Sequence, residues 1–254
     1  MKKLLAITAL SAALFFGQTA AAEEKAAEEV KPSHVEMVLV LDESGSMSNL
    51  TNDTIGGFNS MIEKEKKLDV DAHVTTVLFN DQYKMLYNRR ELKDVRKMTD
   101  KDYTPGGMTA LLDAVGRTIH KMDMVSGIHR KDKGNKVLFV IITDGEENDS
   151  REYTYADVKK LIKDRQENAG WEFIFLGANI DAVAAAENLG IDGDRAVKYK
   201  NTGSGVRANF KAVAELSDSL AKSGRVSDEW KETVEKDEDD AVDTQSAAVT
   251  LHRR

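Results

Sequence analysis

The sequence contains no cysteine. This absence excludes a disulfide framework, and it also excludes lipid attachment through a thiol. The mature protein must therefore be held together by its hydrophobic core, to which a bound metal ion could add stability. Hydrophobic residues make up 41% and charged residues 31% of the 254 residues, a composition that supplies such a core and argues against wholesale disorder.

The sequence also has no surplus of basic residues. It contains 36 lysines and arginines but 44 acidic residues, which gives a formal net charge of -8. Proteins that bind DNA or RNA normally carry a basic surface, so we expect no nucleic-acid partner. No pattern recurs with a period of about 20 to 50 residues, which excludes solenoids and propellers. One folded domain is the simplest organisation that fits the chain.

Long uncharged runs are confined to the start of the chain, where two lysines precede LLAITALSAALFFGQTAAA. This pattern predicts an export signal over residues 1–22, cleaved after Ala22, followed by a charged linker over residues 23–33. An uncleaved membrane anchor is the alternative, since the uncharged stretch is just long enough to cross a bilayer. We expect an exported protein of the periplasm or the extracellular space, with no membrane insertion after signal cleavage.

From residue 34 to about residue 199, apolar runs alternate with helical patterns, which predicts an α/β fold with a mostly parallel sheet. The expected strands are HVEMVLVL, AHVTTVLFN, YKMLYN, KVLFVIIT, WEFIFLG and RAVKYK. Only two residues separate the second strand from the third, so we expect an antiparallel hairpin at one edge of the sheet. Thr154 and Asp181 are expected to cap helices, and a closing helix is expected around residues 210–220. Residues 223–254 are interpreted as an acidic flexible tail.

Carboxylates and hydroxyls gather in the sequence at the points where the expected strands end. Asp42, Ser44 and Ser46 follow the first strand at alternate positions, and Asp144 follows the strand KVLFVIIT. The glycine-rich loop TPGGMTALLDA delivers Thr109 to the start of a helix. Open α/β folds place ligands at the carboxyl edge of the sheet, so we expect these five side chains to converge there. Their ligand atoms are all oxygen, which suits Mg²⁺ or Mn²⁺ and not zinc or copper.

Together, DESGS, the threonine of GGMTALLDA and the aspartate of TDGEE resemble the metal-ion-dependent adhesion site of von Willebrand factor A (vWA) domains. The resemblance implies a Rossmann-like vWA domain over residues 34–222, with helices on both faces of the sheet. It also implies that Ser44, Ser46 and often Thr109 bind Mg²⁺ directly, with Mn²⁺ or Ca²⁺ as further candidates. Asp42 and Asp144 would act mainly through water.

The resemblance further implies that an Asp or Glu of a protein partner fills the open coordination position on the metal. Neutral hydroxyl ligands leave the cation under-neutralised, which favours such an anion. Met108 stands where a small or polar residue is frequent in the family. This difference bears on the geometry of the loop and not on Thr109 as a ligand. The expected function is therefore a binding module, and no catalytic residues are assigned.

Three other interpretations remain open at this point. Each of the three segments DESGS, GGMTALLDA and TDGEE, taken singly, could serve only to cap a helix or to shape a turn. A Mg²⁺-dependent hydrolase such as a phosphatase could use Asp42 as a nucleophile or base. Phosphatases with an aspartate nucleophile have a second aspartate two positions later, which the following sequence ESGSM lacks. A metal bound at the sheet edge could also stabilise the fold without recruiting any partner.

Histidines give no separate indication of a metal site. Their positions along the chain do not have the spacing of metal ligands, which favours surface or packing roles. The five are His34, His73, His120, His129 and His252.

Overall fold

The computed structural model describes residues 34–68, 70–125 and 135–236. The expected signal peptide and linker therefore lie outside the described residues, as does the end of the expected tail. Within the described part of the chain, no helix combines the length and apolar character needed to cross a membrane.

A six-stranded sheet with the order β3-β2-β1-β4-β5-β6 forms the centre of the domain. Its strands are β1 (His34–Asp42), β2 (Ala72–Phe79), β3 (Tyr83–Glu91), β4 (Asn135–Thr143), β5 (Glu172–Gly177) and β6 (Ala196–Lys198). Every neighbouring pair is parallel except β2 and β3, which pair antiparallel at one edge. The predicted mostly parallel sheet with one antiparallel edge strand is confirmed.

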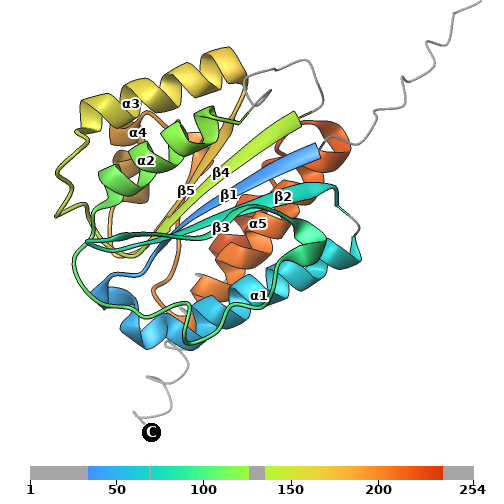
Figure 1. Ribbon diagram of the computed structural model, residues 1–254, viewed down its shortest axis with the longest axis horizontal. Coiled ribbons are helices and arrows are strands. Elements are labelled where there is room, and N and C mark those ends of the chain that lie inside the picture. Colours follow the sequence, from blue (N-terminus) through green and yellow to red (C-terminus); the bar gives the residue numbers. More distant parts are fainter. Residues whose placement is uncertain (1–33, 69, 126–134, 237–254) are drawn as a thin grey trace, which may run out of the picture.

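Helices cover both faces of this sheet (Figure 1). One face carries α1 (Thr51–Lys67) and α5 (Gly203–Ser223), and the other carries α2 (Leu111–Asp123), α3 (Tyr155–Asp164) and α4 (Ala182–Leu189). Short 3₁₀ helices span Gly45–Leu50, Leu92–Asp94 and Gly193–Arg195, and a π-helical turn spans Arg165–Ala169.

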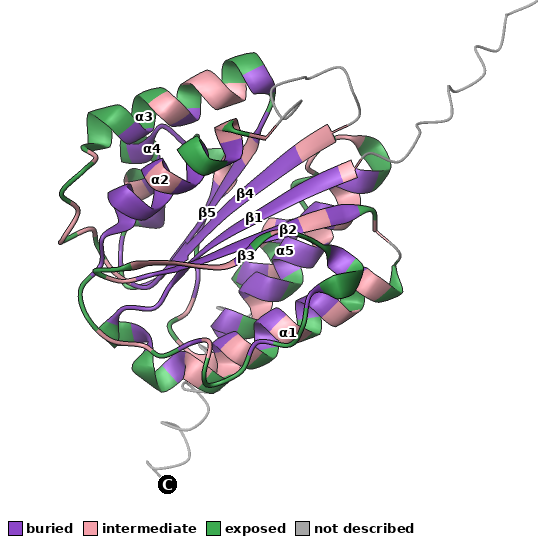
Figure 2. Ribbon diagram, viewed as in Figure 1, coloured by how far each residue is buried: buried purple, intermediate pink, exposed green. Residues whose placement is uncertain are grey.

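The alternation of side chains along β1 divides the interior into two cores. Met37, Leu39 and Leu41 pack with residues of α1 and α5, whereas Val38 and Val40 pack with residues of α2, α3 and α4. Both faces of β1 are therefore buried along most of its length (Figure 2). This double burial explains why the strand reads as an almost continuous apolar run.

Local signals in the sequence set the ends of several helices. Thr154 caps α3 in a capping box with Asp157, and the side chain of Asp181 caps α4 by accepting from the backbone N–H of Ala184. Both predicted caps are confirmed. Gly190 ends α4 in the left-handed conformation that a residue without Cβ adopts at little cost.

The expectation that the chain becomes a flexible tail at residue 223 is wrong for its first part. Residues 230–236 are helical, and Trp230 and Val234 are each only 1% exposed within the core that contains α5. These two residues stand four apart and so share one helix face, which buries them while Glu232 between them stays exposed. The folded domain therefore extends to at least residue 236.

A buried carboxyl group connects α1 with α5 beneath the sheet. Glu65 is fully buried, and one of its oxygens, Oε2, accepts a hydrogen bond of 2.7 Å from the hydroxyl of Ser217. The other oxygen, Oε1, has no partner in the part of the chain that the structure describes. Burial raises the pKa of Glu65 from 4.5 to about 7, an effect that the Ser217 hydrogen bond only partly opposes.

This raised pKa makes the stability of the domain depend on pH. Between pH 4.5 and about 7 the unfolded carboxyl loses its proton while the folded one keeps it, so we expect the free energy of unfolding to fall as pH rises. The full difference corresponds to about 3 kcal/mol. In Glu65→Gln this fall should be missing, as measured by denaturant unfolding at a series of pH values.

Glu63→Gln, on the same helix but not buried, provides the matched control and should keep the wild-type slope. Parallel curves for the wild type and Glu65→Gln across this pH window would contradict the prediction.

Candidate functional site

Three segments meet at the carboxyl edge of the sheet. β1 and β4 are parallel neighbours in which Leu41 pairs with Ile142, so Asp42 and Asp144 lie at the ends of adjacent strands. Ser44 and Ser46 sit at the start of the 3₁₀ helix that follows β1, and Thr109 lies two residues before α2. All five predicted residues are thus carried to one end of the sheet.

Asp42 is held rigidly by contacts to both of its carboxylate oxygens. Oδ1 accepts a hydrogen bond of 2.7 Å from the backbone N–H of Ser44, and Oδ2 accepts one of 2.6 Å from the hydroxyl of Thr143. Tyr103 donates to the backbone oxygen of Asp42 at 2.6 Å. Burial raises the pKa of Asp42, the bonds from Ser44 and Thr143 oppose this, and nearby Asp144 adds to it. Both oxygens are occupied within the protein.

Hydroxyl groups connect the two strand ends. Ser44 Oγ lies 3.0 Å from Ser46 Oγ, and the Ser46 hydroxyl donates to Asp144 Oδ1 at 2.5 Å. The second oxygen of Asp144 is 3.4 Å from the amide nitrogen of Asn201. Ser44 and Asp144 are buried, whereas Ser46 is exposed. The chain of oxygens therefore begins inside the fold and opens to solvent at Ser46.

Thr109 reaches the same edge from the third segment. Its backbone N–H donates to Asn148 Oδ1 at 2.8 Å, and its carbonyl accepts from the Asn148 N–H at 3.0 Å. A Cβ placed on Gly145 would have Thr109 Oγ1 as its nearest neighbour, at 3.9 Å. The hydroxyl of Thr109 thus faces the turn that follows Asp144.

The glycine-rich loop before Thr109 is tied to the segment after β1. The Gly106 N–H donates to the Glu43 carbonyl at 2.9 Å, and the Gly45 N–H donates to the Gly107 carbonyl at 3.2 Å. Gly107 has a φ of 75°, and a Cβ there would collide with Asp81. Met108, which departs from the residue frequent in the family, is half exposed.

Several residues that support this edge were not predicted. Thr143 stands immediately before Asp144 and could have been inferred, because the last residue of β4 lies beside the last residue of β1. Tyr199 directly follows β6, inside the expected strand RAVKYK, and could have been inferred in the same way, whereas Tyr103 comes from an irregular segment that carries no such signal. The hydroxyl of Tyr199 is buried without a partner among the described residues, and burial together with the nearby aspartates raises its pKa.

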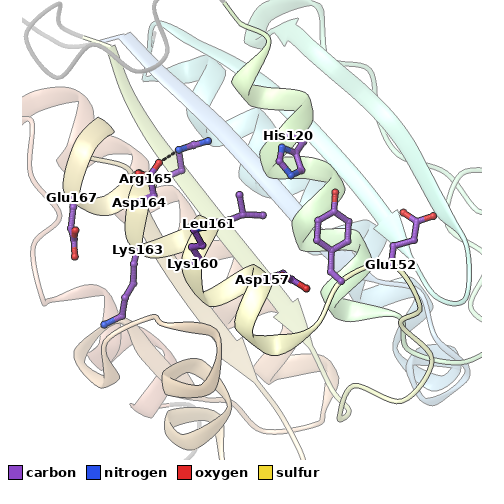
Figure 3. A pocket seen from close by; sticks show the side chains of 10 residues that line it. His120, Glu152, Asp157, Lys160, Leu161, Lys163, Asp164, Arg165 and Glu167 are labelled. Atoms are coloured by element: carbon purple, nitrogen blue, oxygen red, sulfur yellow. Dashed lines mark hydrogen bonds and ion pairs between the residues drawn. The ribbon is translucent and has the colours of Figure 1, made fainter.

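A separate hollow of about 740 Å³ runs along α3 and the adjoining part of α2 (Figure 3). The residues that line it are mostly charged and of both signs, and Arg165 pairs with Asp123 and Asp164 at one end. The labelled side chains in Figure 3 do not converge on one point. The carboxyl edge of the sheet, where five oxygen-bearing side chains meet, is the stronger candidate.

A family model of the vWA domain found in the C terminus of TerF matches residues 34–197. The chain belongs to the vWA domain family. No curated protein sequence matches it significantly.

Several solved structures share the fold. The D319A mutant of the PilB minor pilin from Streptococcus sanguinis is 12% identical with a TM-score of 0.55, covering 77% of this chain and 64% of the pilin. The vWF domain of the pilus tip protein Mfa5 from Porphyromonas gingivalis is 12% identical with a TM-score of 0.53, covering 78% and 99%. The open conformation of the pilus adhesin SpaC from Lactobacillus rhamnosus GG is 14% identical with a TM-score of 0.55, covering 76% and 31%.

This vWA chain therefore spans less than two thirds of the PilB pilin and about a third of SpaC. Identities of 12–14% support the fold alone. What the edge of the sheet binds has to be argued from its own residues.

Replacing Thr143 with valine tests whether the bond to Asp42 holds the edge together. The change removes a hydroxyl but little volume, and it leaves a buried carboxylate oxygen without its donor. We expect the free energy of unfolding to fall by about 1–3 kcal/mol in denaturant titrations.

Thr76→Val is the matched control, because Thr76 is equally buried in β2 and its hydroxyl bonds to none of the described residues. That variant should be neutral or slightly more stable than the wild type. Equal stabilities for the two variants would show that the Thr143 hydroxyl carries no structural role.

Proposed function

We propose that the domain is an exported binding module that recognises a protein partner through a divalent cation. Asp42, Ser44, Ser46, Thr109 and Asp144 hold the cation, which is Mg²⁺, with Mn²⁺ or Ca²⁺ as alternatives. An Asp or Glu carboxylate of the partner completes its coordination. The observation that carries the proposal is the run of oxygen atoms from Ser44 through Ser46 to Asp144.

The spacing of these oxygens fits a hard cation. Ligands at about 2.1 Å in an octahedron place neighbouring oxygen atoms about 3 Å apart. Ser44 Oγ and Ser46 Oγ are separated by 3.0 Å, as two adjacent ligands would be. Each hydroxyl can turn its hydrogen away and present a lone pair, so the present hydrogen bonds do not prevent metal binding.

The charges of the site favour an acidic partner. The hydroxyls of Ser44, Ser46 and Thr109 are neutral and would leave most of the cation's charge uncompensated. Asp42 already accepts two hydrogen bonds from the protein, which restricts it to a supporting role. An external carboxylate supplies the missing negative charge, and the exposed position of Ser46 gives it access.

The proposed location rests on the start of the sequence, where the lysine-led uncharged stretch has the form of an export signal. Pilus proteins of other organisms have the same fold, and we place this domain at the cell envelope as part of the same proposal. Adhesion or the assembly of an envelope complex would both use such a site.

Calorimetric titration with millimolar Mg²⁺, followed by capture of partners from the envelope fraction with and without chelator, tests the proposal. We expect Mg²⁺ uptake by the wild type and partner retention that chelator abolishes. Ser46→Ala, Asp42→Ala and Thr109→Ala should lose both properties while remaining folded.

Ser48→Ala is the matched control, since Ser48 lies in the same exposed turn but bonds the Gly45 carbonyl instead of Asp144. It should retain both properties. Absence of Mg²⁺ uptake by the wild type would refute the proposal. Uptake that raises the melting temperature, with no partner retained, would instead support a purely structural metal.

A further inference from the structure

A second group of potential ligands lies at the opposite end of β1. His34 and Glu36 are two residues apart on this strand and so point to the same face of the sheet. Glu36 pairs with His73 of β2, which brings the second histidine to that face as well. The scattered positions of the histidines in the sequence are therefore misleading for this pair, because strand register brings them together.

Three ligand atoms meet at this point. His34 Nε2 lies 2.9 Å from His73 Nδ1, and these nitrogens lie 3.4 Å and 3.3 Å from Glu36 Oε1. Around a tetrahedral metal with bonds of about 2.0–2.1 Å, ligand atoms stand about 3.3 Å apart. The separations of 3.4 Å and 3.3 Å match edges of such a tetrahedron, and the two nitrogens, 2.9 Å apart, have to part by about 0.4 Å to bind a metal.

We propose that His34, His73 and Glu36 form a Zn²⁺ site with one open coordination position, separate from the cation site at the carboxyl edge. Two imidazole nitrogens and one carboxylate select zinc or a similar transition metal, because Mg²⁺ and Ca²⁺ prefer oxygen alone. The assignment does not depend on the proposed partner-binding function.

The surroundings hold two of the ligands in the orientation that a metal needs. Asp71 Oδ1 lies 3.0 Å from His34 Nδ1. A proton on Nδ1 leaves the lone pair of Nε2 free to face His73 and Glu36, which is how carboxylates orient metal-binding histidines. Arg89 Nε donates to Glu36 Oε2 at 3.0 Å and to Oε1 at 3.2 Å, and this fixes the plane of the carboxylate. A terminal nitrogen of Arg89 also donates to Oε1 and lies 3.3 Å from His73 Nδ1, so this part of the guanidinium has to draw back from both ligand atoms when a metal enters.

Arg89 reaches Glu36 because the edge of the sheet is irregular there. The pairing of β2 with β3 shifts register between Val74 and Thr76, and Arg89 adopts a φ of 45°, which is rare for a residue with a side chain. Bulges of this kind redirect a side chain. The Arg89 N–H is bonded to Thr75 Oγ1 at 3.1 Å, so the redirected backbone keeps a partner.

The proposed zinc site is partly exposed to solvent, although its carboxylate is buried. The Glu36 side chain is 4% exposed, whereas those of His34 and His73 are 18% and 26% exposed. A hollow of about 480 Å³ lies over the two histidines, next to Asp71 and Glu91. A metal can therefore enter from this side, and water or an external ligand can take the fourth position.

The charge of the cluster also suits a divalent cation. Glu36 and Asp71 contribute two negative charges, and Arg89 offsets only one of them. The competing explanation is that a proton, and not a metal, sits among these groups and that His34 is a cation paired with its two carboxylates. Metal titration separates the two explanations.

The test uses the full chain after chelator treatment, titrated with Zn²⁺ by calorimetry in a buffer containing Mg²⁺, so that the carboxyl edge is already supplied. We expect one Zn²⁺ per chain and, with Co²⁺, the intense visible absorption of tetrahedral coordination. His34→Gln and His73→Gln should weaken Zn²⁺ binding by about 100-fold or more. Asp71→Asn, which keeps all three ligands, should weaken it by about 10- to 100-fold.

His120→Gln is the matched control, because His120 is a half-exposed histidine on α2, away from the cluster, and it should bind Zn²⁺ as the wild type does. Melting curves without metal establish that each variant folds. If a histidine variant does not fold, Asp71→Asn takes its place in the Zn²⁺ titration. The proposal is overturned if the wild type takes up no Zn²⁺, if Co²⁺ shows only the weak octahedral absorption, or if the folded variants bind as the wild type does.

Discussion

The parallel pairing of β1 with its two neighbours is the constraint on which the rest of the domain depends. Both faces of β1 are buried, by α1 and α5 on one side and by α2, α3 and α4 on the other. Polar side chains are tolerated there only where the strand leaves the core. Since β1, β2 and β4 run in the same direction, their polar ends accumulate at two opposite edges of the sheet.

At the carboxyl edge this arrangement produces a site from residues far apart in the chain. Asp42 and Thr143 are about a hundred residues apart in sequence, yet they are joined by a hydrogen bond of 2.6 Å. That bond, together with the one from the Ser44 N–H, determines where the carboxylate points before any ligand arrives. Ser44, Ser46 and Asp144 are then arranged around it. For the proposed cation site, preorganisation of this kind lowers the conformational entropy lost on binding.

Much of this could be predicted from the sequence, because the signals are local. Continuous apolar runs indicate the central strands, Thr154 and Asp181 indicate helix starts, and residues directly after a strand lie at the sheet edge. Features that depend on distant packing could not be predicted. Trp230 is buried although it stands in an acidic segment, and Tyr103 reaches Asp42 from an irregular loop.

The histidine cluster shows why spacing alone is insufficient for strands. His34 and Glu36 are neighbours on one face by the period of two, but His73 joins them only through the register of β1 with β2. A rule based on distance along the chain, which serves for helices and zinc loops, cannot detect a pair that strand pairing creates. Arg89 was still less predictable, since its position depends on an irregular pairing in β3.

The two proposed cation sites stand at opposite ends of one strand, and this determines how they relate. His34 and Asp42 are eight positions apart on β1, which at about 3.3 Å per residue corresponds to about 26 Å. That distance is about three Debye lengths at physiological ionic strength, so charge at one site acts only weakly on the other. Their selectivity must therefore come from the ligands themselves. Hydroxyl and carboxylate oxygens at one end and imidazole nitrogens at the other select different metals, so one strand can carry both sites without competition between them.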